Sequence, residues 1–208
     1  MTPPRQTDLF ASRDSTPAGL SPVSHSEPRL ELSAPQLIDW QERVGRLQRQ
    51  VRQELSHAAA DQLSLLREGG PGTDPNAAAV RILPEQLSPQ NLDFWRWPCA
   101  PHQGAAIYFV MDRPPHMEHS LLLYIGETGR ADRRWKGEHD CKSYLAAYSD
   151  ALRRAGLDRL LSIRFWCDVP DGVAARRALE QALIRRWWPP FNKESRERWA
   201  TPFTVDGG

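Results

Sequence analysis

The stretch AAIYFVMDRPPHMEHSLLLYIG, residues 105–126, decides how this 208-residue chain folds. It contains two apolar runs of strand length, Ala105 to Met111 and Ser120 to Ile125, separated by a turn with two adjacent prolines. Apolar runs bounded by turn residues are typical of buried strands, and a short connection between them favours an antiparallel pair. We therefore predict a hairpin whose two strands carry Tyr108 and Tyr124.

The residues after the hairpin predict one more strand, from Leu161 to Val169, with helices on either side of it. The residues expected to face inward are Tyr144, Tyr148, Ala151 and Ala155 before this strand and, after Gly172, Ala175, Leu179, Ala182 and Leu183. Adjacent prolines at 189 and 190 end the last helix. The order strand, strand, helix, helix, strand, helix predicts an α+β fold, with a small three-stranded antiparallel sheet flanked by helices.

The N-terminal half predicts a helix that begins at Ser33, a residue suited to the N-cap, with Pro35 in the first turn. Apolar residues recur at threes and fours along it: Leu37, Trp40, Val44, Leu47, Val51 and Leu55. A further helical piece is predicted from Ala58 to Arg67. The apolar stripe favours packing on the main domain or contact with a partner, and a dimer through it is conceivable.

The chain divides into five parts by composition. They are a Ser-, Thr- and Pro-rich tail (1–30), a helical extension (31–70), a proline-broken connector (71–104), the α+β domain (105–194) and a C-terminal tail (195–208). The first part shows no periodicity, so we predict that it is disordered. The connector contains Phe-Trp-Arg-Trp at 94–97, which suits either a hydrophobic clasp onto the domain or the stacking of nucleic-acid bases.

Composition excludes several classes of protein. The formal net charge is +1, and arginine rather than lysine supplies most of the positive charge. The three cysteines, Cys99, Cys141 and Cys167, form no CxxC pair, which argues against a zinc site or a disulfide framework and suggests buried residues in a reducing compartment. No apolar stretch approaches the ~20 residues of a transmembrane helix, and the N-terminus lacks an apolar signal core. We expect no membrane partner and a cytoplasmic location.

Several polar residues in and beyond the hairpin suit phosphodiester chemistry. Arginine donates to phosphate oxygens through a planar fork, and Arg134 follows the hairpin. Magnesium binds through one or two carboxylates and keeps several waters, so Glu180 alone could anchor it. Tyr108 is a candidate to orient or deprotonate the attacking water, and Tyr124 to orient water or phosphate. Because a free tyrosine has a pKa of about 10, Tyr108 would need a partner that takes or stabilises its proton.

The segment from 105 to about 194 resembles the GIY-YIG endonuclease domain. The two naming motifs match AIY (106–108) and YIG (124–126), with alanine where the family usually has its first glycine. The resemblance implies that Arg134 is the family's catalytic arginine, that Glu180 binds Mg²⁺ or Mn²⁺, and that Asn192 belongs to the site. Because an amide cannot titrate, we expect Asn192 to fix Glu180 or the loop that bears it. It also implies that DNA is the substrate, with repair, recombination and restriction all open as roles.

The family often has a histidine four residues after the arginine, and this chain departs from that spacing. Position 138 is Glu138, and His139 lies one place later. His139 is our candidate catalytic residue, and Glu138 competes with it. Either the helix is locally distorted near Gly137, or Arg133 and Arg134 exchange roles, or histidine is not used.

The tail sequence Gln6-Thr7-Asp8-Leu9-Phe10 resembles the short peptide by which many bacterial DNA-acting proteins dock on the replication sliding clamp. The resemblance implies that Gln6, Leu9 and Phe10 contact the clamp. Each candidate residue also has a purely structural interpretation, so the alternative to a nuclease is a catalytically inactive DNA-binding protein or a clamp-associated accessory protein.

Overall fold

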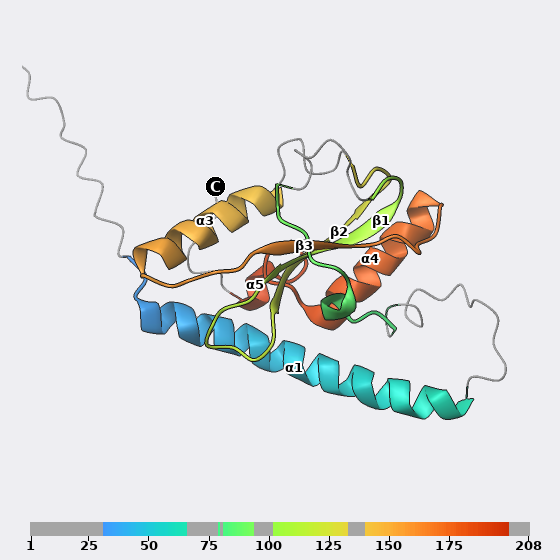
Figure 1. The fold of residues 1–208 in the computed structure, drawn as a ribbon, viewed down its shortest axis with the longest axis horizontal. Coiled ribbons are helices and arrows are strands. Elements are labelled where there is room, and N and C mark those ends of the chain that lie inside the picture. The colour runs from blue at the N-terminus through green and yellow to red at the C-terminus, as the bar shows by residue number, and fades with distance from the viewer. Residues whose placement is uncertain (1–30, 66–78, 80, 94–101, 133–139, 200–208) are drawn as a thin grey trace, which may run out of the picture. The chain divides into compact units, whose positions relative to one another are not determined.

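The fold was obtained as a computed structural model, which describes residues 31–65, 79, 81–93, 102–132 and 140–199. Its elements, in chain order, are α1 (Ala34–Leu65), the 3₁₀ helix η1 (Pro84–Gln86), β1 (Ala106–Asp112), β2 (Leu121–Thr128), α3 (Asp140–Arg154), β3 (Ser162–Trp166), α4 (Val173–Trp187) and α5 (Arg196–Trp199) (Figure 1). The three strands form one antiparallel sheet, so the predicted α+β class is confirmed.

Strand β1 lies at the centre of the sheet, in the order β2-β1-β3. All seven of its residues are buried, as expected for a strand covered on both faces. The predicted hairpin is confirmed: β1 and β2 pair antiparallel, with Tyr108 opposite Gly126 and a shift of register after Val110. Strand β2 continues to Thr128, three residues beyond the predicted end at Ile125.

Alternate residues of the sheet enter two separate cores, because successive side chains of a strand point to opposite faces. One face carries Tyr108 and packs with α3, while the other carries Ile107 and Phe109 and packs with α4. In Figure 1, α3 and α4 lie on opposite sides of the labelled strands. Helix α1 contributes to both cores: Trp40 belongs to the first, and Val51 to the second.

Helix α1 begins directly after the predicted N-cap Ser33, and Gln36, three residues further on, supplies one half of a capping box. The Ser33 backbone N–H donates to Gln36 Oε1 at 2.9 Å, and the Ser33 carbonyl accepts from the Leu37 N–H at 3.1 Å. The apolar stripe is buried, apart from Leu47, which is partly buried. It contacts β2 and α4, which confirms intramolecular packing. The helix runs without a break to Leu65, so the two predicted pieces are one helix.

The connector closes the outer edge of β3. Gln90 and Ile163 exchange backbone hydrogen bonds of 2.8 and 2.9 Å in an isolated bridge. Arg164 Nη1 also donates to the carbonyls of Glu85 and Leu87, both at 2.7 Å. Since an unpaired strand edge invites association with other chains, these contacts protect the sheet.

A buried polar chain ties α1, β1 and α3 together. The Tyr148 hydroxyl donates to Asp112 Oδ2 at 2.7 Å and accepts from Gln41 Nε2 at 2.6 Å. The second oxygen of Asp112 accepts the Leu160 N–H at 2.8 Å. Burial raises the pKa of Asp112, although the hydrogen bonds from Tyr148 and Leu160 oppose the rise, and burial beside Asp112 raises the pKa of Tyr148 well above its ordinary value.

Two predictions about buried residues are wrong. Ala175 is exposed, and the buried residue on that part of α4 is Arg176. Cys141 is buried as predicted, but Cys167 is exposed. Cys99 and the aromatic cluster at 94–97 lie outside the described residues. Within the described ranges, no helix combines the length and apolar character needed to cross a membrane.

Candidate functional site

The outer edge of β2 is closed by side chains instead of another strand. Asn192, on the turn after α4, accepts the Ile125 N–H through Oδ1 at 2.9 Å and donates to the Ile125 carbonyl through Nδ2 at 2.8 Å. In the same way, Gln48 of α1 accepts the Leu122 N–H through Oε1 at 2.9 Å and donates to the Leu122 carbonyl through Nε2 at 2.8 Å. The amide suits this task because it carries a donor and an acceptor side by side.

Glu180 meets the same edge two residues further along. It projects from α4 and accepts the backbone N–H of Glu127 through Oε1 at 3.0 Å. The side chain is partly buried. A hydrogen bond from a fixed backbone donor holds the carboxylate in position.

Tyr108 lies on the α3 face of the sheet, directly over Gly126. A Cβ built on Gly126 would lie 2.3 Å from both Cζ and the hydroxyl oxygen of Tyr108, so the strand or the ring would have to shift. The glycine of the YIG motif is therefore required by a close approach between a ring and a backbone. Tyr124 stacks beside Tyr108, with ring centroids 5.9 Å apart.

Four of the residues predicted for the site thus converge on the segment 124–127. Tyr124 belongs to it, Tyr108 covers Gly126, Asn192 brackets Ile125, and Glu180 binds the N–H of Glu127. Standard backbone dimensions then place the Tyr108 hydroxyl oxygen and Glu180 Oε1 within about 9 Å of each other. These residues come from β1, β2 and α4 with the turn that follows it. Tyr108 and Asn192 are more than 80 positions apart in the sequence.

The two phenols differ in accessibility. Tyr108 is fully buried, whereas Tyr124 is half-buried and packs against the rim of the core. Helix α4 covers the face of the sheet opposite the tyrosines, and Glu180 reaches the edge of β2 from that side. The carboxylate therefore lies at the edge of β2, while the phenols lie on the α3 face of the sheet, and Tyr124 is the more accessible phenol.

Asn192 was expected to fix Glu180 or the loop that bears it. Its two hydrogen bonds go to Ile125, so it ties the turn after α4 to the strand that carries the YIG motif. The other predicted residues, Arg134 and His139 with the competing Glu138, lie outside the described residues. The same is true of the tail peptide Gln6, Leu9 and Phe10.

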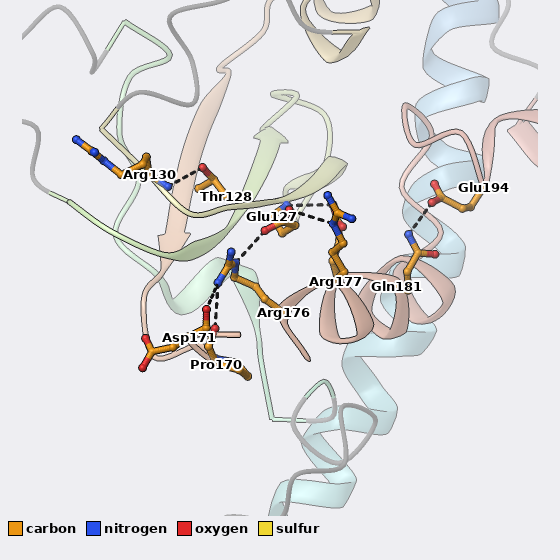
Figure 2. A network of polar contacts seen from close by, with 10 residues as sticks. Glu127, Thr128, Arg130, Pro170, Asp171, Arg176, Arg177, Gln181 and Glu194 are labelled. Atoms are coloured by element: carbon orange, nitrogen blue, oxygen red, sulfur yellow. Dashed lines mark hydrogen bonds and ion pairs between the residues drawn. The ribbon is translucent and has the colours of Figure 1, made fainter. Parts of the chain in front are cut away.

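A second set of charged residues surrounds Glu127, which periodicity did not reveal (Figure 2). Arg176 donates from Nε to Glu127 Oε2 at 2.8 Å, and Arg177 Nε lies 3.6 Å from Glu127 Oε1. Helical periodicity scores apolar residues, so it selected Ala175 and passed over the buried arginine beside it. The signal that was missed is the charge of Arg176 on the buried face of α4, which Glu127 on the facing strand β2 can pair.

The donor set at Glu180 fits a magnesium-type ion and no softer metal. A carboxylate oxygen is a hard ligand, and magnesium commonly takes one or two carboxylates while keeping waters. Across the described part of the chain, no three His, Cys, Asp or Glu side chains gather into a ready-made metal cage. His116 lies exposed in the β1–β2 turn.

Cys167 and His102 form a pair of reactive side chains away from the edge of β2. Cys167 Sγ lies 3.4 Å from His102 Nδ1. Burial raises the pKa of the thiol and lowers the pKa of the imidazole, so both groups are neutral in their favoured forms. This is opposite to the shift that activates a cysteine nucleophile.

No family model, curated protein or solved structure matches this chain. The assignment of a function therefore depends on the residues and distances described above.

Proposed function

We propose that this chain is a divalent-metal-dependent endonuclease of the GIY-YIG type, which hydrolyses phosphodiester bonds in DNA. The observation that carries the proposal is the convergence on residues 124–127 of Tyr108, Tyr124, Glu180 and Asn192. These are four of the five residues on which the resemblance depends. If the four residues had unrelated structural roles, nothing would require all of them to lie at the same peptide segment.

Each residue then has a definite task. Glu180 supplies a fixed, hard oxygen that would hold Mg²⁺ or Mn²⁺, and a bound ion of this kind supplies Lewis-acid stabilisation of the leaving oxygen. Tyr124, the more accessible phenol, orients the attacking water or the phosphate. Tyr108 packs over the YIG glycine, and Asn192 holds the strand in place. Arg134 holds the non-bridging phosphate oxygens, where such electrostatic support is often the largest catalytic contribution.

The second candidate is a DNA-binding domain without cleavage activity. The observation in its favour is the complete burial of Tyr108, because a phenol that deprotonates water must be reached by that water. If proton transfer instead passes through Tyr124 with His139, the burial of Tyr108 does not prevent catalysis.

A cleavage screen separates the two candidates. Purified protein is incubated with linear, supercoiled, flapped and branched DNA, each with Mg²⁺ or Mn²⁺. We expect cleavage that EDTA stops and that Glu180→Ala abolishes, while Glu194→Ala, an exposed glutamate on the neighbouring turn, retains it. Cleavage that survives Glu180→Ala or EDTA would falsify the metal assignment. DNA binding without nicking on any substrate would favour the second candidate.

The tail peptide adds a proposed partner. If Gln6, Leu9 and Phe10 dock on the replication sliding clamp, the tail would raise the local concentration of the nuclease at replicating or repaired DNA. Composition predicts that the tail is disordered, and the ordering of such a segment on binding costs free energy, so we expect modest affinity. In the second candidate function, the same peptide would make the chain an accessory protein of the clamp.

A further inference from the structure

Arg176 is an unusual residue for its position. It lies in the first turn of α4, yet its side chain is only 3% exposed. A buried guanidinium loses its hydration and must be paired and hydrogen-bonded to be tolerated. Its carboxylate partner, Glu127, is itself 16% exposed. A residue held at this cost in free energy calls for a specific role.

The contacts of Arg176 join three parts of the fold. Nε donates to Glu127 Oε2 on β2 at 2.8 Å, and Nη1 donates to the carbonyls of Pro170 and Asp171 at 3.1 and 3.0 Å. Figure 2 shows the guanidinium between Glu127 and the loop that precedes α4. The arginine therefore fixes the start of α4 along the edge of β2.

Glu180 follows Arg176 by four residues, which places both on the same side of the helix, one turn apart. Both bind Glu127: Arg176 takes its side chain, and Glu180 takes its backbone N–H. Two contacts at adjacent turns fix the rotation and the axial position of α4 relative to β2. The position of the Glu180 carboxylate is therefore coupled to the pair formed by Arg176 and Glu127.

We propose that Arg176 is a positioning residue for the metal-binding carboxylate of Glu180, an inference that rests on the proposed metal-dependent function. Being buried, Arg176 acts through Glu127 and does not touch the substrate. Lysine cannot replace it, because a single ammonium cannot serve the carboxylate and two carbonyls in the planar geometry of the guanidinium. Arg177 is the matched control, since it is 69% exposed and lies 3.6 Å from the same carboxylate, a longer contact than that of Arg176.

The test is a titration with Mn²⁺ alone, followed by the electron paramagnetic resonance signal of the free ion, on the full chain without DNA. Loss of a residue that orients a metal ligand typically weakens metal binding about 10–100-fold. We therefore expect Arg176→Lys to raise the half-saturating Mn²⁺ concentration by about tenfold or more. Arg177→Lys should stay within about twofold of the native chain, because its contact is exposed and long. In cleavage assays, saturating Mn²⁺ should restore most of the rate of Arg176→Lys.

The controls separate this inference from the proposed function. If Glu180→Ala binds Mn²⁺ as the native chain does, the metal assignment itself fails. If Glu180→Ala loses binding while Arg176→Lys keeps native affinity, only the positioning role is overturned. Should Arg176→Lys fail to fold, Arg176→Met combined with Glu127→Met removes both charges and leaves the Glu127 N–H, and such replacements are often tolerated. Native Mn²⁺ affinity in that folded variant would equally overturn the role.

Discussion

Gly126→Ala is the substitution whose effect follows most directly from the structure. The added Cβ would lie 2.3 Å from Cζ and the hydroxyl oxygen of Tyr108 and 2.7 Å from Cε1. The phenol is fully buried against Phe165 and Tyr124, so its ring cannot move aside without displacing both. The substitution therefore strains the core and moves the tyrosine pair that forms one side of the candidate site.

The expected loss of stability is that of an overpacked core. An extra carbon forced into a packed interior typically costs about 1–3 kcal/mol. Replacing glycine in a strand returns about 0.4–1 kcal/mol through the unfolded chain. Because a contact of 2.3 Å is far inside van der Waals separation, we place the net loss at about 1–2 kcal/mol.

Urea unfolding followed by circular dichroism measures this loss, with the slope checked for constancy. Gly129→Ala is the matched control, because its Cβ would meet only Arg176 Nη2, at an ordinary 3.7 Å; it should change stability by less than about 0.5 kcal/mol. In a Tyr108→Leu background, Gly126→Ala should cost much less, giving a coupling energy of about 1 kcal/mol or more. Equal costs in both backgrounds would refute the close contact.

Two further predictions concern the contacts that hold the sheet. Asn192→Ala removes the hydrogen bonds to the N–H and carbonyl of Ile125 and should lower the free energy of unfolding in urea by about 2–4 kcal/mol. The exposed neighbour Lys193→Ala should lower it by less than about 0.5 kcal/mol. A loss below about 1 kcal/mol for Asn192→Ala would show that these two hydrogen bonds are dispensable. Burial raises the pKa of Asp112 above its ordinary 3.8, so the folded chain binds this proton more tightly than the unfolded chain. The stability of the native chain relative to Asp112→Asn should therefore fall as the pH rises from 3.8 through the raised pKa, and a difference that grows with pH would contradict the burial argument.

The sequence predicted the parts of the fold that depend on apolar pattern. The runs that became β1 and β2 are continuous and bounded by turn residues, so their pairing followed from local signals. The α1 stripe was equally clear, since Leu37, Trp40 and Val44 repeat at helical spacing and are all fully buried. The motif residues Tyr108, Tyr124, Glu180 and Asn192 were chosen from the sequence, and the structure brings all four to residues 124–127.

The contacts that were not predicted are polar and long-range. Gln48 brackets Leu122 across 74 positions, and Arg176 pairs with Glu127 across 49. Periodicity cannot identify such residues, because a buried polar side chain is acceptable only where a partner from another element meets it. The sequence left open whether the Tyr108 hydroxyl is reachable or covered, since an aromatic residue in a strand has the same pattern in both cases.

The most direct test of the account is to locate the metal by paramagnetic broadening. Native chain labelled with ¹⁵N is titrated with substoichiometric Mn²⁺, and the amide signals are compared with those of Glu180→Ala. We expect the amides of residues 124–127 to broaden first in the native chain and to remain sharp in Glu180→Ala. Broadening centred elsewhere, such as on His116 and His119 in the β1–β2 turn, or unchanged by Glu180→Ala, would contradict a metal site at the edge of β2.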